Sequence, residues 1–257
     1  HTPMQEHDLT MVKTIMCNGS PFGAQGYKYI YEKVKHDVHL VSPSGGTDSF
    51  GSLVSNHPIG PVWPGEIQGP ALGFAVDIYD PAGISLRGEP GELVVCKPFP
   101  SMPLEYLNDL NRERYLATYF QHYPNVWRHG DWAEFTEHGG IVIHGRSDAT
   151  LNANGVRVGA AEIYGLLSNV SVVVESVVVG QQWEGDSRIV LFVKLKDGLF
   201  LDENLREHIK KQIRQNLSPR HVPAKIISVD AVPTTITGKV SEVAVLDAIH
   251  GRPVRNR

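Results

Sequence analysis

The chain has 257 residues, of which 41% are hydrophobic and 20% charged, and its formal net charge at pH 7 is −4. This length allows one large domain or two smaller ones, each with its own buried core. The slightly acidic balance excludes a nucleic-acid-binding protein that works through bulk positive charge. No apolar run approaches the roughly 20 residues of a membrane helix, and the first residues do not resemble a signal peptide. We therefore expect a cytoplasmic protein without nucleic-acid or membrane partners.

Cysteine and histidine content limits the metal chemistry. Cys17 and Cys96 lie far apart in the sequence; they could pair, but two cysteines exclude a disulfide framework and a four-cysteine zinc site. The 12 histidines have spacings that match no zinc-binding signature. We therefore expect a reducing compartment and no zinc ion.

The first 50 residues predict a strand, a helix and a second strand in succession. Residues 11–17 are mostly apolar and predict a buried strand, whereas apolar side chains at positions 27, 30, 31 and 34 predict one face of a helix. Residues 38–42 predict the second strand. This order is the unit of a parallel sheet, whose ligands bind beyond the carboxyl ends of the strands. The segment Ser44–Asp48 follows the second strand at that position.

Residues from about 60 to 144 predict short strands joined by turns. Phe74, Val76 and Ile78 alternate with three other residues, which predicts a strand over 74–79. A turn follows at 80–83, and a further strand is expected after Gly91. Residues 132–144 predict a hairpin that turns at 137–140. Strands and turns at this spacing predict a small barrel or a curled sheet.

The pattern changes after residue 148. Short strands alternate with helices there, and the expected elements are 156–158, 160–167, 172–179, 189–195 and a helix that follows Asp202. Asp202 is a good N-cap residue, and Pro219 ends the helix that it begins. We place the domain boundary at Asp148. Residues 1–147 are then expected to combine a mixed α/β unit with a curled β-sheet, and residues 148–257 to form a small α+β domain.

The segment Ser44–Asp48 has the composition of a phosphate-binding turn. Gly45 and Gly46 let the backbone approach a ligand closely, and the Thr47 hydroxyl can bond to a phosphate oxygen. Asp48 offers the hard carboxylate oxygens that Mg²⁺ prefers. Taken alone, such a segment is more often an ordinary turn between strands.

Further polar residues stand at a strand end and in loops. Asp131 could hold both hydroxyls of a ribose, and Arg146 could reach a phosphate or a ribose. Asp148 could serve as a hinge at which the backbone changes direction. Lys239 ends a loop of small residues, from which its ammonium could stabilise developing negative charge. Taken alone, each of these residues is more often a turn cap, part of a linker or a solvent-exposed lysine.

Five short motifs occur in one order along the chain. They are GGTD at 45–48, HGD at 129–131, GRSD at 145–148, NGVR at 154–157 and TGK at 237–239. This ordered set resembles that of the adenylate-forming enzymes, which include acyl-CoA synthetases, luciferases and peptide-synthetase adenylation domains. Longer stretches are similar to the acetoacetate-activating acyl-CoA synthetases, among them GEIQGPALG at 65–73, GDWAEFTEHGG at 130–140 and PRHVPAKI at 219–226. The resemblance implies the end of a large AMP-binding domain followed by a small, mobile C-terminal domain.

The resemblance also implies a nucleotide site in the first domain. Its nucleotide-binding residues would be Gly45, Gly46, Thr47, Asp131 and Arg146. Thr47 would contact the α-phosphate of ATP or of the acyl-adenylate during catalysis, and Asp131 would bind the ribose hydroxyls. Asp48 would help to hold Mg²⁺, although most of the superfamily has glutamate at this position.

In the second domain the resemblance implies residues that serve two reactions in turn. Asp148 would be the hinge, and Lys239 would be the catalytic lysine of adenylate formation. Gly155 and Arg157 would face the active site when the domain rotates for thioester formation, with Gly155 beside the pantetheine of CoA. Arg214 lies 25 residues before Lys239, a spacing at which related short-chain synthetases place a contact to a CoA phosphate.

The implied activity is that of an acid–thiol ligase. ATP and acetoacetate would give acetoacetyl-AMP and pyrophosphate, and CoA would then displace AMP. The family's Ser/Thr/Gly-rich phosphate loop, which ends in lysine, has no counterpart between His1 and Val41, so we expect the C-terminal part of a longer synthetase that is inactive alone. Two alternatives stay open. An acetyl- or propionyl-CoA synthetase would share the nucleotide motifs. A non-catalytic nucleotide-binding or interaction module would explain why the phosphate loop is absent.

Overall fold

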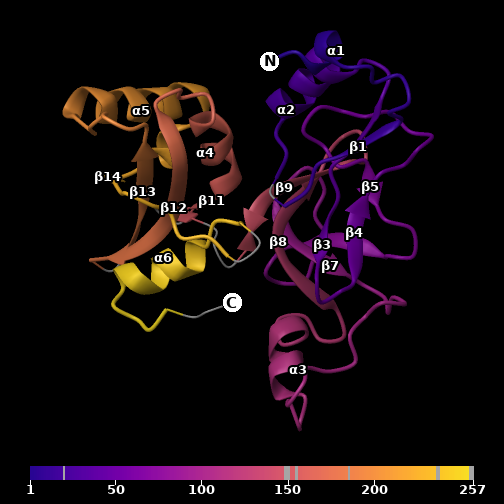
Figure 1. Ribbon diagram of the computed structural model, residues 1–257. Coiled ribbons are helices and arrows are strands. Elements are labelled where there is room, and N and C mark those ends of the chain that lie inside the picture. Colours follow the sequence, from indigo (N-terminus) through magenta and orange to yellow (C-terminus); the bar gives the residue numbers. More distant parts are fainter. Residues whose placement is uncertain (20, 148–150, 154–155, 185, 236–237, 255–257) are drawn as a thin grey trace. The chain divides into compact units, whose positions relative to one another are not determined.

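Two compact units make up the chain, residues His1–Ile143 and His144–Arg257. The computed structural model describes the chain except residues 20, 148–150, 154–155, 185, 236–237 and 255–257, and it describes the backbone alone at 152–153, 156–157 and 186 (Figure 1). The predicted boundary at Asp148 lies outside the described residues. Among the residues that are described, no helix has the length and apolar character needed to cross a membrane.

The first unit begins with the predicted strand–helix–strand arrangement. Its elements are α1 (Pro3–Glu6), β1 (Thr14–Met16), α2 (Ala24–Tyr29), the π-helical turn η1 (Ile30–Val34) and β2 (His39–Val41). β1 and β2 pair in parallel, which confirms the predicted unit. The Tyr27 ring is buried, and its hydroxyl donates a hydrogen bond to the Glu66 carbonyl oxygen at 2.9 Å.

The prediction of a buried strand over residues 11–17 is wrong in its extent and its burial. β1 covers three residues, and the side chains of Met11 and Met16 are 86% and 63% exposed. The reason is that, within the described residues, β1 pairs with β2 alone, so the sheet buries only part of the strand's surface. Cys17, which follows β1, is a free thiol, as is Cys96.

A three-stranded antiparallel sheet follows at the GGTD motif. Its strands are β3 (Ser44–Gly46), β4 (Gly51–Ser55) and β5 (Gly69–Pro70), in the order β3-β4-β5. The motif therefore starts as a strand and ends as the tight turn of a β3–β4 hairpin. Two adjacent glycines suit this turn, because the two strands approach each other closely there.

The next strands form one row in the order β6-β7-β8-β9. They are β6 (Val76–Tyr79), β7 (Gly91–Val95), β8 (Trp127–Phe135) and β9 (Ile141–Arg146), and the short helix α3 (Glu113–Tyr119) precedes β8. The hairpin predicted over 132–144 is confirmed as β8–β9. In the part of the chain that is described, the row is an open sheet and not the closed barrel that the strand spacing also allowed.

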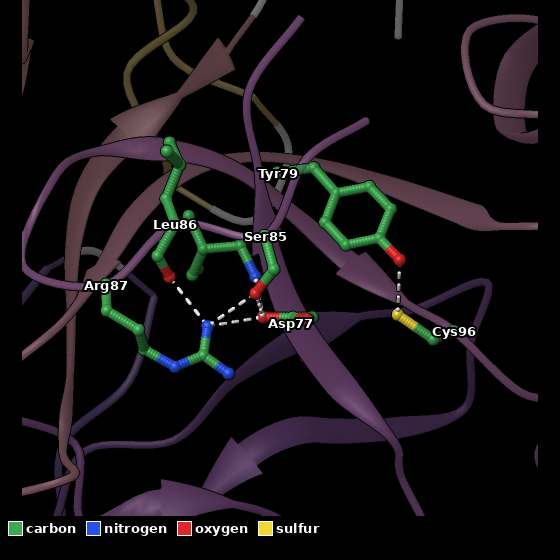
Figure 2. A network of polar contacts seen from close by, with 7 residues as sticks. Asp77, Tyr79, Ser85, Leu86, Arg87 and Cys96 are labelled. Atoms are coloured by element: carbon green, nitrogen blue, oxygen red, sulfur yellow. Dashed lines mark hydrogen bonds and ion pairs between the residues drawn. The ribbon is translucent and has the colours of Figure 1, made fainter. Parts of the chain in front are cut away.

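Polar contacts brace the connection between β6 and β7 (Figure 2). The Asp77 carboxylate accepts hydrogen bonds from Arg87 Nη1 at 2.7 Å and Ser85 Oγ at 3.0 Å. The Cys96 thiol donates to the Tyr79 hydroxyl at 3.3 Å, just past the end of β7. These bonds tie the turn after β6, and the residue after β7, to side chains of β6.

The second unit has a three-stranded sheet between helices. Its elements are β10 (Leu151–Ala153), β11 (Val156–Val158), α4 (Ala160–Leu167), β12 (Val173–Trp183), β13 (Asp186–Leu195), α5 (Glu203–Asn216), the 3₁₀ turn η3 (Pro219–His221), β14 (Lys225–Ser228) and α6 (Glu242–Ile249). β12 pairs antiparallel with β13, which pairs in parallel with β14. The helices predicted at 160–167 and after Asp202 are confirmed, and the Asp202 side chain caps α5 by accepting a bond from Leu205 N at 2.8 Å.

Alternate residues of β12 enter two separate cores. Val178 packs with the apolar faces of α4 and α5, which contribute Ile163, Leu167, Ile209 and Ile213. Val177 and Val179 pack on the other side of the sheet, with Val245 of α6. Because successive strand residues point to opposite faces, one strand supports helices on both of them. This accounts for the almost continuous run of valines in β12.

Candidate active site

Two of the predicted motifs meet in the first unit although 87 positions separate the residues that touch. Ser44, at the start of β3, donates a hydrogen bond from Oγ to Asp131 Oδ2 of β8 at 3.1 Å. Asp131 is only 6% exposed, and His129 Nε2 lies 3.7 Å from the same carboxylate oxygen. The HGD carboxylate is thus held beside the GGTD hairpin by a hydroxyl donor.

The two motif glycines are required by close packing. A Cβ at Gly45 would overlap the carbonyl oxygen of Gly51 across the hairpin, and a Cβ at Gly46 would overlap the Asp48 carboxylate and come within 3.2 Å of His129 Cε1. A larger residue at position 45 would push β3 away from β4, and one at position 46 would displace the Asp48 carboxylate. These contacts require glycine at both positions without a ligand, so the nucleotide-binding role of Gly45 and Gly46 stays a prediction.

Asp48 projects at the exposed tip of the hairpin, next to the exposed Thr47. Its Oδ1 accepts the Ser49 backbone N–H at 3.0 Å, and its Oδ2 accepts the hydroxyl of Tyr119. Ser49 itself is fully buried, and its Oγ bonds to the amide and the carbonyl of Gly46. The turn therefore has a fixed shape, and the carboxylate has a fixed direction.

Tyr119 is a site residue that sequence reasoning missed. Its hydroxyl accepts a bond from Tyr106 at 2.7 Å, and its ring stacks on Trp127 with centroids 3.6 Å apart. Burial and the hydrogen bond to the Asp48 carboxylate raise the pKa of Tyr119 above its ordinary value, so the phenol stays protonated and keeps donating. No local pattern marks this residue, because α3 and β8 bring it to the hairpin from 71 positions away.

The Asp48 carboxylate fits a magnesium ion that is bound mainly through substrate phosphates. Mg²⁺ commonly keeps several waters and takes one or two protein carboxylates together with phosphate oxygens. Asp48 is exposed, and each of its oxygens keeps a lone pair beside the bonds from Ser49 and Tyr119. The described residues contain no group of three or more His, Cys, Asp or Glu side chains that could hold a metal by themselves.

The remaining predicted residues all lie in the second unit, residues His144–Arg257. Arg146 is exposed at the end of β9, and Arg214 is exposed in the last turn of α5. Asp148 and Gly155 lie outside the described residues. Arg157 is described by its backbone alone, in β11 opposite Asn152. The roles predicted for these five positions stay predictions.

Lys239 lies before α6, next to an antiparallel bridge between Thr234 and Val240. Its backbone carbonyl accepts the Thr235 N–H at 2.7 Å, and its own N–H donates to Thr235 Oγ1 at 3.1 Å. Gly238 before it has a φ of +79°, which favours glycine, and the Lys239 residue is exposed. The backbone of this lysine is therefore anchored while its side chain extends into solvent.

A charged cluster at the start of the second unit was also missed. Glu162 of α4 lies 2.9 Å from His221 Nε2 and 3.5 Å from His144 Nδ1. Hydrogen bonds from His144 and His221 lower the pKa of Glu162 to about 2. His221 in turn contacts Ser218 Oγ at 2.8 Å. The cluster ties the end of β9 and the 3₁₀ turn to the first turn of α4.

Comparison with known proteins gives matches along the whole chain. Residues 162–239 match the family described as AMP-binding enzyme C-terminal domain. The chain is 52% identical over 256 residues to acetoacetyl-coenzyme A synthetase of Rhizobium meliloti (strain 1021), which covers 100% of this chain and 39% of that protein. It is 44% identical over 257 residues to acetoacetyl-CoA synthetase of Rattus norvegicus, which covers 99% of this chain and 38% of that protein.

Solved structures agree with these relatives. Acetoacetyl-CoA synthetase from Streptomyces lividans matches with a TM-score of 0.89 and 42% identity, over 98% of this chain and 38% of that one. A benzoate CoA ligase from Burkholderia xenovorans LB400 matches with a TM-score of 0.74 and 27% identity, over 91% of this chain and 45% of that one. The chain spans about 39% of the length of the curated relative from Rhizobium meliloti. The resemblance predicted from the motifs is confirmed: over its whole length the chain matches a part of the acetoacetyl-CoA synthetases in sequence and in fold, with an AMP-binding enzyme C-terminal domain at residues 162–239.

Proposed function

We propose that this chain works within a synthetase of its relatives' length, which activates acetoacetate with ATP and transfers the acyl group to CoA. The observation that carries the proposal is the contact of Ser44, the residue just before the GGTD motif, with Asp131 of the HGD motif, at one place in the first unit. The identity of 52% to a Rhizobium meliloti acetoacetyl-coenzyme A synthetase supports the choice of acid. A trial of acetoacetate, acetate and propionate with pyrophosphate release as the readout tests that choice.

In the first half-reaction the acid must become a better electrophile. The buried Asp131 carboxylate accepts the ribose hydroxyls of ATP, and Thr47 at the hairpin tip donates its hydroxyl to the α-phosphate. Arg146 adds positive charge near the ribose and phosphate. Asp48 helps to hold Mg²⁺, which when bound offsets phosphate charge. Lys239 places its ammonium between the substrate carboxylate and the α-phosphate, where negative charge gathers as the bond forms.

In the second half-reaction CoA attacks the acyl carbon and AMP leaves. Asp148 is the hinge about which the small domain turns, and this motion removes Lys239 from the reacting atoms. Gly155 and Arg157 then face the pantetheine, and Arg214 contacts a CoA phosphate. One site thus serves two reactions because the domain presents different residues in each.

The test is the Lys239→Ala variant of a synthetase of the relatives' length that contains this chain. Adenylate formation should fall by about 10²–10³, the usual cost of removing one preorganised donor. Reaction of supplied acetoacetyl-AMP with CoA should stay near the unmodified rate, because Lys239 has left the site in that step. The two half-reactions are measured separately under single-turnover conditions.

Lys196→Ala serves as the matched control, since Lys196 is an exposed lysine in a turn of the same unit. This control should leave both half-reactions unchanged. Equal losses in the two half-reactions of Lys239→Ala, with the fold intact, would contradict the role given to Lys239. If neither half-reaction of Lys239→Ala is slower, Lys239 is an ordinary solvent-exposed lysine.

A further inference from the structure

Glu92 is a buried carboxylate that no motif-based role explains. It lies in β7, is 4% exposed, and faces the HGD segment of the neighbouring strand β8. Its Oε1 accepts the backbone N–H of Gly130 at 3.0 Å. Its Oε2 lies 3.1 Å from Nε of Arg128. Glu92 therefore has two contacts in β8. One is the backbone N–H between His129 and Asp131, and the other is the side chain of Arg128.

The reason for this contact lies in the register of the sheet. Glu92 is opposite Trp132 and Val94 is opposite Arg128, so the three residues 129–131 face the single residue Leu93. The extra residues form a bulge, and Gly130 within it has a φ of +87°. A buried backbone N–H that a bulge removes from the ladder needs another acceptor. The Glu92 carboxylate is that acceptor.

A carboxylate is a costly way to satisfy one amide. Burying a charge is unfavourable unless it is paired and hydrogen-bonded, and an apolar pair of similar volume is often as stable. Here the charge is paired with Arg128, whose side chain is 24% exposed. Glu92 thus links two points of β8, one at the start of the bulge and one at its centre. Such a link holds the shape of the bulge more than it adds to stability.

The bulge decides where the site residues point. Asp131 follows Gly130 directly, and its Oδ2 is the atom that meets Ser44 Oγ at 3.1 Å and His129 Nε2 at 3.7 Å. We propose that Glu92 is a positioning residue, which holds the Gly130 turn so that the Asp131 carboxylate faces the ribose hydroxyls of the nucleotide. This rests on the proposed function, because it takes Asp131 as the ribose ligand.

The test compares two nucleotides that differ only at the ribose. AMP and 2′,3′-dideoxy-AMP are titrated against the full 257-residue chain, with amide resonances followed by NMR. The unmodified chain should prefer AMP by at least tenfold, and Asp131→Ala should abolish that preference. Glu92→Ala should lower the preference at least fivefold through weaker AMP binding, with dideoxy-AMP binding unchanged. Adding Glu92→Ala to Asp131→Ala should have no further effect on the preference.

Two conservative variants separate the hydrogen bond from the charge. Glu92→Gln keeps an oxygen that can accept the Gly130 N–H, so it should retain the preference within about threefold. Glu92→Asp keeps the charge but is one methylene too short, so it should lose the preference as Glu92→Ala does. These two variants carry the test where Glu92→Ala does not fold. Val94→Ala is the matched control, because Val94 is a fully buried residue of the same strand: it should lower the unfolding temperature and leave the preference unchanged.

The outcomes distinguish the two proposals. A preference for AMP that survives in Glu92→Ala, or in Glu92→Asp, contradicts the role of Glu92 while leaving Asp131 as the ribose ligand. Equal weakening of both nucleotides also contradicts it, since that is the result of a purely structural role. An unmodified chain that binds both nucleotides equally, or binds neither, contradicts the ribose assignment of Asp131 and with it the role of Glu92.

Discussion

The hydroxyl of Tyr119 donates a hydrogen bond to the carboxylate of Asp48, and the Tyr119 ring stacks on Trp127 beneath it. A buried aromatic ring thus holds the direction of an exposed carboxylate. The relationship matters because aspartate is the shorter of the two carboxylate side chains. A shorter side chain reaches less far, so its direction has more effect on what it can bind.

Tyr119→Phe should weaken the use of magnesium and ATP by a synthetase that contains this chain. Phenylalanine keeps the stacking on Trp127 and removes only the hydroxyl that holds Asp48. A lost hydrogen bond of about 0.5–1.5 kcal/mol corresponds to roughly twofold to tenfold in affinity. We therefore expect the Mg²⁺ concentration at half-maximal rate to rise severalfold. Tyr106→Phe is the control, since it keeps the Tyr119–Asp48 bond. Equal effects of the two variants would argue against positioning of Asp48 by Tyr119.

Asp131→Ala should raise the KM for ATP at least tenfold in the same synthetase. A carboxylate that accepts two ribose hydroxyls makes bonds worth roughly 1.5–3 kcal/mol each. Ser44→Ala should have a smaller effect, because it removes a donor that orients Asp131 and leaves the carboxylate in place. Steady-state kinetics with varied ATP measures both. An unchanged KM and kcat/KM for Asp131→Ala would refute the ribose assignment.

Acid should destabilise the second unit through Glu162. The pKa of Glu162 is lowered to about 2 from an ordinary value of 4.5, so the folded chain binds fewer protons there than the unfolded chain. The contribution of ionised Glu162 to the unfolding free energy is therefore complete above about pH 4.5 and is lost as the pH falls toward 2. Because the Glu162 side chain is 37% exposed, solvent screening limits the effect to about 1 kcal/mol.

Glu162→Gln should therefore flatten the pH dependence of the unfolding free energy between pH 4.5 and 2. Glu203→Gln, at an exposed residue of α5, should leave that dependence unchanged. Denaturant unfolding at several pH values measures both variants. If the unfolding free energy of Glu162→Gln depends on pH as steeply as that of the unmodified chain, the contacts of Glu162 with His144 and His221 are not the source of the acid sensitivity.

The 257-residue chain alone should not catalyse ATP–pyrophosphate exchange. It spans 39% of the length of its Rhizobium meliloti relative, and residues 1–41 contain no Ser/Thr/Gly-rich loop ending in lysine. The β- and γ-phosphates need such a backbone cradle and its cation for adenylate formation. The exchange assay compares the chain with a synthetase of the relatives' length at equal concentration. Exchange at a comparable rate by the chain alone would overturn this expectation.

Some features of this protein follow from the sequence by itself, because their physical causes are local. Asp202 caps α5 through a residue three positions away, and Leu205, Ile209 and Ile213 recur at the helical period, so the helix could be predicted from one window of residues. The β8–β9 hairpin and the parallel strand–helix–strand unit follow in the same way. The order of five motifs likewise predicted the family, although it assigned no contact between them.

Only the tertiary structure decided the contacts that make the site. Ser44 meets Asp131, Tyr119 meets Asp48 and Glu92 meets the Gly130 amide across 87, 71 and 38 positions. These contacts depend on how strands and helices distant in sequence are brought together, and the Glu92 contact also depends on a bulge, so no local periodicity contains that information. The strand predicted as buried over residues 11–17 was wrong for the same reason: its burial depends on how many strands pair beside it, which its own residues do not specify.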